Sequence, residues 1–203
     1  MIALKPVIQE TESSCGPAVC VMLLSHLNKK ITQNEFIQAA QVQDWLEEHG
    51  TQPHHMAKAV SSLAPDLEYW LKNKATLENL EFLVHQNEWP VAVNWQGLFY
   101  DTPEEEPSYP SADKGHYSVV VDVNVEKDLI TLIDPYPDFS GNPRTFSLQW
   151  FAERWWDVGD HLDSSSGKIT KFLTNKLLFL ITPKNETFPL AIDMTNSFIE
   201  TNN

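Results

Sequence analysis

Basic residues are scarce in this sequence. Its 203 residues include 14 Lys and Arg against 28 Asp and Glu, which gives a formal net charge of -14. A chain with this charge repels phosphate backbones, and no cluster of Lys and Arg offsets the repulsion. We therefore exclude nucleic acid as a partner and expect a basic or neutral one.

Long apolar runs are also missing. No stretch approaches the roughly 18 apolar residues of a membrane-spanning helix, and the apolar part of residues 1–7 is too short for a signal peptide. We expect no integral membrane segment and, by default, a cytoplasmic protein. Export by a route that needs no N-terminal signal stays open.

Cysteine is rare as well, with only Cys15 and Cys20. Two cysteines cannot staple a small secreted scaffold, and a spacing of five places their side chains on different faces of a helix. We predict that both are thiols.

The residues that are present predict one folded domain. Hydrophobic residues make up 42% of the chain, and it has seven Trp and ten Phe, far from the composition of a disordered protein. A chain of this length can bury most of its apolar surface around a single core. We predict one catalytic domain over residues 1–185, followed by a polar C-terminal tail over residues 186–203.

Helical patterns fill the first half, and strand patterns fill the second. Apolar spacing and capping residues predict helices at about 15–28, 33–40, 56–63 and 77–86. Runs of β-branched and aromatic residues predict strands at 90–95, 116–123, 129–133 and 177–182. This order predicts an α+β fold in which a helical N-terminal half packs on an antiparallel sheet.

Cys15 is the first candidate for chemistry. It stands directly before Gly16 and Pro17, at the start of the first predicted helix. The unpaired N–H groups and the positive dipole end of a helix N-terminus favour the thiolate, which is the nucleophilic form of cysteine. A nucleophile also needs a base. Among seven histidines, His116 alone opens a strongly apolar strand and follows a glycine, Gly115, that permits close approach.

Asp134 is the candidate partner of His116. If residues 124–128 form a hairpin turn, the numbers of paired residues sum to about 250–252, so Asp134 lies opposite His116 or diagonally across from it. Pro135 ends the strand there and leaves the carboxylate at the rim of the sheet. A contact between the histidine and the carboxylate is therefore expected.

With these three positions the sequence resembles a known family. The matching motifs are Gln9, residues 14–18 (Ser-Cys-Gly-Pro-Ala), residues 116–121 (His-Tyr-Ser-Val-Val-Val) and the Asp134-Pro135 pair, supported by Phe36, residues 50–53, Gly141 and residues 151–155. They resemble the papain-like peptidases that cleave double-glycine leaders in bacteriocin-exporting ABC transporters, in their free-standing, transporter-free form. Each motif is weak alone, but their order and spacing are specific together.

The resemblance implies a papain-like cysteine peptidase with a peptide or protein substrate. Cys15 would be the nucleophile, His116 the general base and Asp134 the orienting acid, while Gln9 would donate to the oxyanion together with the backbone N–H of Cys15. The sequence also departs from the family. Ser14 stands where transporter-borne members have Asp, and an acidic insertion follows Gly97. We therefore do not transfer the family's substrate.

The insertion, residues 101–113, is predicted to be a mobile flap near the active site, because the strand that follows it begins with the base. Residues 136–143 form a second predicted loop. We expect no metal and no cofactor, since His49, His54 and His55 fit a polar turn better than a ligand set. The Trp-rich residues 150–156 are expected in the core or in a packed helix.

Two other functions stay open. The same triad could serve a deamidase, a transamidase or a ubiquitin-type isopeptidase. Alternatively, the chain could be a catalytically silent peptide-binding module that has kept the fold. Oligomeric state and cleavage-site preference cannot be read from the sequence.

Overall fold

A computed structural model describes residues 1–97, 99, 114–139, 141–163 and 168–196. The helices are α1 (Cys15–His26), α2 (Gln33–Ala40), α3 (Leu46–His49), α4 (Pro53–Leu63), α5 (Leu77–Glu81) and α6 (Leu148–Arg154), with a π-helix at Phe82–Gln86 and 3-10 turns at Pro137–Phe139 and Leu190–Ile192. The strands are β1 (Leu67–Lys72), β2 (Val91–Gln96), β3 (Gly115–Asn124), β4 (Leu129–Ile133), β5 (Pro143–Ser147), β6 (Trp156–Asp163), β7 (Lys168–Asn175), β8 (Leu177–Pro183) and β9 (Thr195–Asn196).

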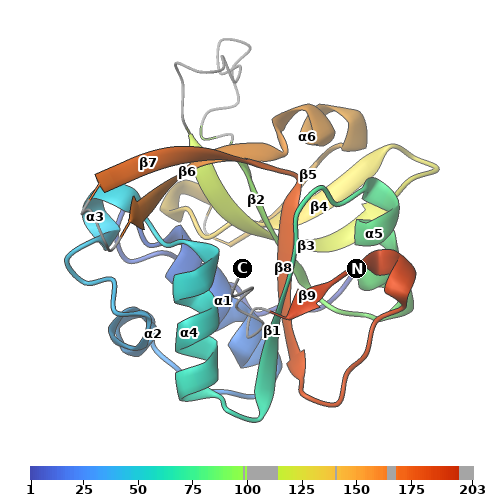
Figure 1. Ribbon diagram of the computed structural model, residues 1–203. Helices are drawn as coiled ribbons and strands as arrows, with labels where there is room; N and C mark the ends of the chain where they lie inside the picture. Colours follow the sequence, from blue (N-terminus) through green and yellow to red (C-terminus); the bar gives the residue numbers. More distant parts are fainter. Residues whose placement is uncertain (98, 100–113, 140, 164–167, 197–203) are drawn as a thin grey trace.

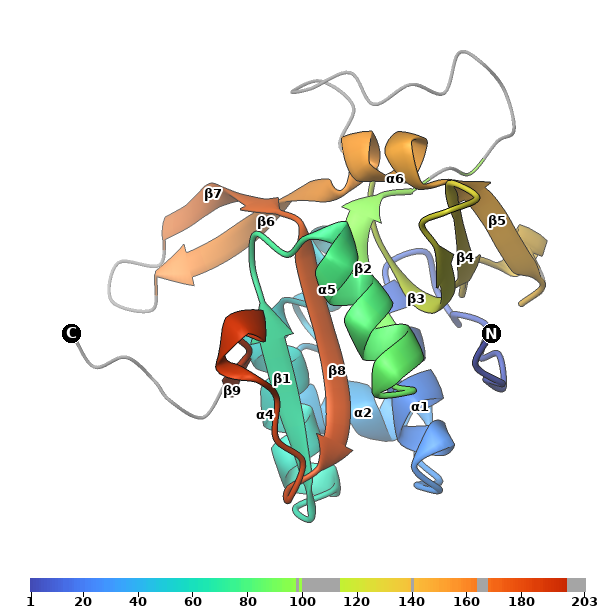
Figure 2. The ribbon, with the colours of Figure 1, turned by 90° about the vertical axis from the view of Figure 1, so that its right-hand side faces the viewer.

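Seven strands form one antiparallel sheet in the order β5-β4-β3-β2-β8-β1-β9. The helices α1, α2 and α4 cover one face, and α5 and α6 lie on the other (Figures 1 and 2). Neighbouring strand residues point to opposite faces. Val119 and Val121 of β3 therefore join the core under α1, whereas Val120 joins the core under α5 and α6. The α+β fold, with helices packed on an antiparallel sheet, is the predicted one.

The predicted helices form, with shifted ends. The capping box of Thr32 and Glu35 is present at the start of α2. The helix expected at 56–63 begins earlier, because Pro53 suits the first turn of α4. The helix expected at 77–86 is α5 continued by the π-helix, in which Asn87 N–H bonds to the carbonyl of Phe82 five residues back.

All four predicted strands are present, and most of the helices lie in the first half of the chain, as predicted. Strand β1 lies within the first half, and α6 lies within the second. A further hairpin, β6–β7, forms a separate two-stranded sheet that projects from the body of the molecule (Figure 2). The segment of α6 places Phe151 and Trp155 in the core, as expected for the Trp-rich stretch.

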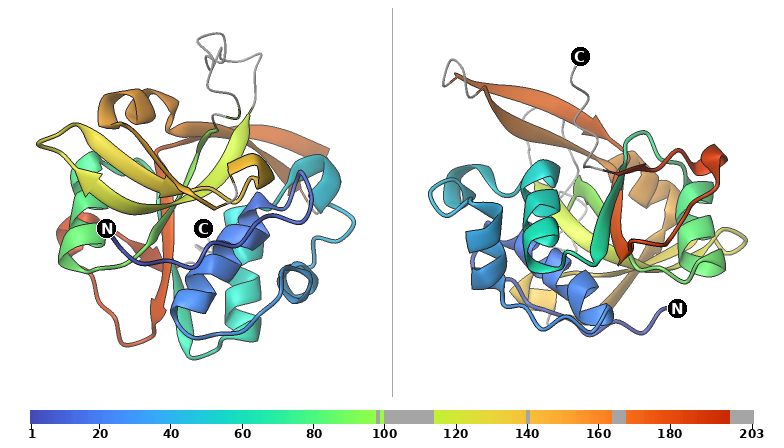
Figure 3. Two further views of the ribbon diagram at one scale, coloured as in Figure 1. Left: turned by 180° about the vertical axis from the view of Figure 1, so that it is seen from behind. Right: turned by 60° about the horizontal axis from the view of Figure 1, so that its bottom comes forward.

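The first and last described segments of the chain lie against the sheet. The N-terminal segment crosses the back of the molecule toward α1 (Figure 3), and Ile2 N–H bonds to the carbonyl of Val121. Strand β9, which lies within the predicted tail, pairs with Trp70 and Leu71 of β1. The domain boundary at residue 185 stays a prediction, and residues 197–203 lie outside the described residues.

Two further expectations concern loops and membranes. Residues 101–113, the predicted flap, lie outside the described residues. The second predicted loop holds the 3-10 turn at Pro137–Phe139. Within the described ranges, no helix is both long and apolar enough to cross a bilayer.

Candidate active site

Cys15 is the first residue of α1 and is partly exposed. Ser14, directly before it, is fully buried. Its hydroxyl accepts the N–H of Thr11 at 2.8 Å and donates to the Thr11 carbonyl at 3.0 Å, which closes the turn leading into the helix. Gly16, directly after it, lies against Thr51, where an added Cβ would come within 3.0 Å of the Thr51 Cβ. The local sequence therefore keeps the cysteine at the helix start.

His116 is the second residue of β3, across from Trp95 of β2. Only 3% of it is exposed, and its Nε2 lies 2.8 Å from Oδ1 of Asp134. The ring of Phe99 meets the imidazole edge-on, with 5.1 Å between the ring centroids. An added Cβ at Gly97 would lie 2.9 Å from the His116 Cβ, so a larger residue at position 97 would displace the histidine. The imidazole is thus fixed on several sides.

The β3–β4 register places Asp134 beside His116. Ile133, the last residue of β4, pairs with Val119, so the next residue faces Ser118. His116 lies two residues from Ser118 and on the same face. Asp134 is therefore diagonal to His116, which is one of the two arrangements that the spacing predicts. The register shifts by one residue past Val120, away from the site.

Asp134 is almost fully buried and accepts four hydrogen bonds. Besides His116, the donors are Tyr136 N–H at 2.9 Å, the Ser118 hydroxyl at 3.1 Å and the Arg144 guanidinium at 3.4 Å. A carboxylate that accepts several N–H and O–H groups stays ionised even when water is excluded. The carboxylate is therefore held in one orientation as an anion.

Burial and charge oppose each other at the His116–Asp134 pair. Burial alone would lower the pKa of His116, but the Asp134 charge, the hydrogen bond to Asp134 and the nearby Cys15 raise it to about 10. Burial alone would raise the pKa of Asp134, but the His116 charge and the hydrogen bonds from His116 and Tyr136, with Arg144 nearby, lower it. The pair is therefore an imidazolium and a carboxylate at neutral pH.

Cys15 lies near His116 and contributes to the raised pKa of the imidazole. Because Asp134 occupies Nε2, the ring nitrogen left for the sulfur is Nδ1. The sulfur comes from α1, and the imidazole comes from the sheet, two layers that meet in one apolar core. The structure thus brings together the three side chains singled out in the sequence, with His116 between Asp134, which it contacts, and Cys15, which acts on its pKa.

Gln9 lies beside the same site. Its backbone N–H bonds to the carbonyl of Pro135 at 2.9 Å, next to Asp134. Its side-chain Nε2 donates to the carbonyls of Thr11 at 2.9 Å and Glu12 at 3.1 Å. Its Oε1 is buried and, among the described residues, has no hydrogen-bond partner. The amide is therefore turned toward the loop before Cys15.

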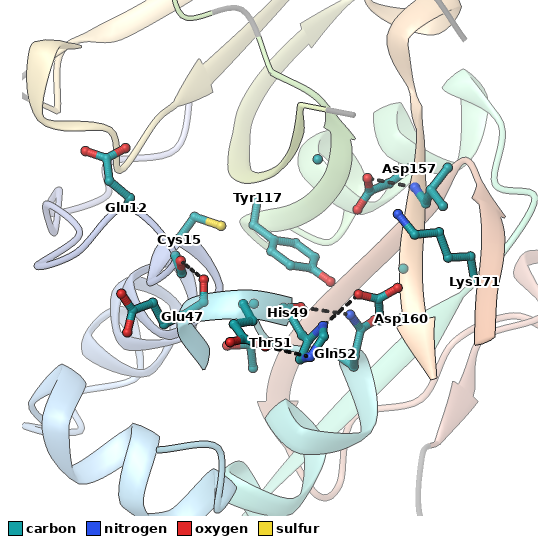
Figure 4. A pocket seen from close by; sticks show the side chains of 16 residues that line it. Glu12, Cys15, Glu47, His49, Thr51, Gln52, Tyr117, Asp157, Asp160 and Lys171 are labelled. Carbon is teal, nitrogen blue, oxygen red and sulfur yellow. Dashed lines mark hydrogen bonds and ion pairs between the residues drawn. The ribbon is translucent and has the colours of Figure 1, made fainter. Parts of the chain in front are cut away.

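A cleft of about 400 Å³ opens at Cys15 (Figure 4). One wall comes from the loop before α1 and from the α3–α4 turn, and the other comes from β3 and the β6–β7 hairpin. Its lining residues are Glu12, Ser13, Cys15, Glu47, Glu48, His49, Gly50, Thr51, Gln52, Gly115, Tyr117, Asp157, Val158, Gly159, Asp160 and Lys171. The cleft gives Cys15 room for an extended ligand.

Sequence reasoning missed three parts of this site. Ser118 is two residues after His116 in a strand, so the two-residue period could have identified it as a partner of Asp134. Arg144 lies on β5, which the pattern did not show, and no local signal links it to Asp134. The third part is the wall of the cleft formed by the β6–β7 hairpin, which was missed because neither strand was predicted from the sequence.

The three histidines weighed as metal ligands, His49, His54 and His55, have other contacts. His49, at the end of α3, has its Nδ1 2.8 Å from the carboxylate of Asp160 on β6. The rings of His54 and His55 lie 3.9 Å apart, and burial, with His54 and Lys58 nearby, lowers the pKa of His55 to about 4. In the described part of the chain, no three potential metal ligands gather at one point.

Two solved structures share this fold. The peptidase domain of Streptococcus ComA, a bifunctional ABC transporter in a quorum-sensing pathway, has a TM-score of 0.56 and 18% identity over 91% of this chain and 100% of that chain. A double-glycine-motif protease from an AMS/PCAT transporter, in complex with the leader peptide, has a TM-score of 0.57 and 13% identity over 90% and 94%. Both likenesses show the fold.

No curated protein matches this chain. A family model described as the Peptidase_C39 like family matches residues 1–161, which include Gln9, Cys15, His116 and Asp134. The chain therefore belongs to the Peptidase_C39-like family of cysteine peptidases.

Proposed function

We propose that the protein hydrolyses a peptide or isopeptide bond with Cys15 as nucleophile, His116 as acid and base, and Asp134 as the orienting group. One observation carries the proposal: His116 holds Asp134 through Nε2 at 2.8 Å and lies near enough to Cys15 for Cys15 to raise the pKa of the imidazole. This is the arrangement that thiol catalysis needs.

The reaction would run in two halves. The Cys15 thiolate attacks the substrate carbonyl, and the carbonyl oxygen becomes an oxyanion that accepts the backbone N–H of Cys15. Imidazolium His116 gives its Nδ1 proton to the leaving amine as the C–N bond breaks, which leaves a thioester. Neutral His116 then takes a proton from water, the hydroxide attacks the thioester, and the acid product leaves as the thiolate returns.

Gln9 is the second oxyanion donor in this proposal. In the free protein its Nε2 points to the carbonyls of Thr11 and Glu12. The role therefore requires the amide to turn when a substrate enters. The unsatisfied Oε1 of Gln9 makes its present orientation costly to keep, since a buried acceptor without a partner costs about 1–3 kcal/mol.

The test uses peptides from a digested proteome as substrates. The wild-type protein and Cys15→Ala are incubated with the mixture, and new peptide ends are identified by mass spectrometry. We expect cleavage by the wild type only. Cys20→Ala is the matched control, because Cys20 is buried in the same helix and plays no part in the reaction. Equal product sets from wild type and Cys15→Ala would refute the proposal.

The same data separate the alternatives. Release of ammonia or a mass increase of about one dalton, without new peptide ends, is the result for a deamidase, and joined peptides are the result for a transamidase. A silent module binds peptides without changing them.

A further inference from the structure

Strand β6 has one edge with no partner strand in the described part of the chain, because its sheet contains only β6 and β7. Lys176 N–H bonds to the Trp155 carbonyl at 2.9 Å, immediately beside the first ladder pair. Backbone groups alternate between the two edges of a strand. Val158 and Asp160 therefore turn their N–H and C=O groups away from β7. The Val158 N–H follows this pattern, since it donates to the Asp157 side chain on its own strand at 2.8 Å.

This open edge faces the cleft at Cys15. Four consecutive residues of β6, residues 157–160, line the cleft, whereas β7 contributes only Lys171. A cleft over the face of the hairpin would be lined by alternate residues of both strands. Consecutive residues from one strand are typical of an edge. The contact between His49 and Asp160 ties this part of β6 to α3.

The charges around the cleft are mostly negative. Five carboxylates line it against one lysine and one histidine. His49 contacts Asp160, and Asp157 accepts hydrogen bonds from the Asn94 and Gln96 amides and the Val158 N–H. Glu12 and Glu47, on the Cys15 side of the cleft (Figure 4), form no ion pair within the described ranges. They are therefore free to meet a cation.

We infer that the open edge of β6 binds the substrate as an added strand, and that Glu12 and Glu47 select a basic side chain in it. This inference rests on the proposed function for the scissile bond at Cys15. The N–H and C=O of Asp160 and the C=O of Val158 pair with the substrate main chain. The substrate is an unfolded or flexible segment with Lys or Arg close to the bond that is cut.

The experiment measures binding to the Cys15→Ala protein, so that it does not depend on turnover. The probes are fluorescently labelled eight-residue peptides with Arg, Gln or Glu at each position in turn, read by fluorescence anisotropy. We expect the best Arg peptide to bind about fivefold or more tightly than its Glu counterpart, the effect of two exposed ion pairs.

Backbone pairing is tested on the best peptide by N-methylation of each residue in turn. Loss of one paired N–H should weaken binding about tenfold, and only at alternate residues, because the residues between them point away from β6. The period of two is a result that a purely electrostatic site does not produce.

Charge selection is tested with Glu12→Gln/Glu47→Gln, which should abolish the preference for Arg. Glu126→Gln in the exposed β3–β4 turn makes the same kind of change away from the cleft and should keep the preference. If Arg and Glu peptides bind equally, if no probe binds, or if N-methylation shows no period of two, the inference is wrong, even where the wild type cleaves peptides. Strand-like, Arg-selective binding without any cleavage by the wild type supports the inference and refutes the proposed function.

Discussion

Replacing Asp134 by Asn removes the charge that faces His116 and keeps the shape of the side chain. The pKa of His116 is raised to about 10 from an ordinary value of 6.5. That difference corresponds to about 5 kcal/mol of preference for the imidazolium. In Asp134→Asn, His116 stays buried, but the carboxylate charge that stabilised its imidazolium form is gone. We therefore expect the pKa of His116 to fall to 6.5 or below.

The measurement is a pH titration of the histidine ring nitrogens by NMR, with His116 assigned from the spectrum of His116→Ala. It needs no substrate. Asp66→Asn, which removes a surface carboxylate paired with Lys29, is the matched control and should leave the His116 titration unchanged. If wild-type His116 titrates near 6.5, or if Asp134→Asn titrates like the wild type, the reasoning is refuted.

The same pair makes stability depend on pH in a defined window. Because the pKa of His116 is raised in the folded protein, its contribution to the free energy of unfolding is complete below pH 6.5 and is lost as the pH rises through about 10. A lowered pKa for Asp134 means that its contribution is present above about 3.8 and is lost as the pH falls through the lowered value. The free-energy difference between wild type and Asp134→Asn should therefore be largest between about pH 4 and pH 6.5 and should shrink on both sides of that window.

Two further predictions concern the thiols and the hydroxyl at the site. In the folded protein at pH 6, iodoacetamide should label Cys15 quickly and Cys20 slowly, because Cys20 is fully buried and burial, with Cys15 nearby, raises the pKa of its thiol; equal, slow labelling by mass spectrometry would contradict an activated thiol. Ser118→Ala should lower the free energy of unfolding by about 1–3 kcal/mol, since the Trp95 Nε1–H, 3.0 Å from the hydroxyl, loses its buried partner; an unchanged urea midpoint would contradict this.

The β3–β4 hairpin could be predicted from the sequence because its strands are apolar and its turn is short. The period of two then carried the argument from His116 to Asp134. The start of α1 could also be predicted, since Ser14 and Pro17 stand together there, although the Ser14 side chain makes no capping hydrogen bond to the helix. These local signals supplied the three side chains of the candidate triad.

The cleft wall could not be predicted in this way. Strand β6 contains Gly159 and several polar residues, so its sequence does not resemble a strand. It becomes one through pairing with β7 and through contacts with distant residues, such as the bond from Asn94 to Asp157. Arg144 reaches Asp134 across the sheet for the same kind of reason. Tertiary contacts of this type leave no local pattern.

The layered construction of the site has a consequence for how activity responds to temperature. Cys15 lies on α1, whereas His116 and Asp134 belong to the sheet, and much of what holds the two layers together is apolar packing. A shift of α1 by one residue along its axis moves the sulfur about 1.5 Å, and misplacement by about 1 Å can cost on the order of 100-fold in rate. We therefore expect peptide cleavage to be lost on warming before the sheet unfolds, because a small separation of the two layers moves the sulfur away from the imidazole.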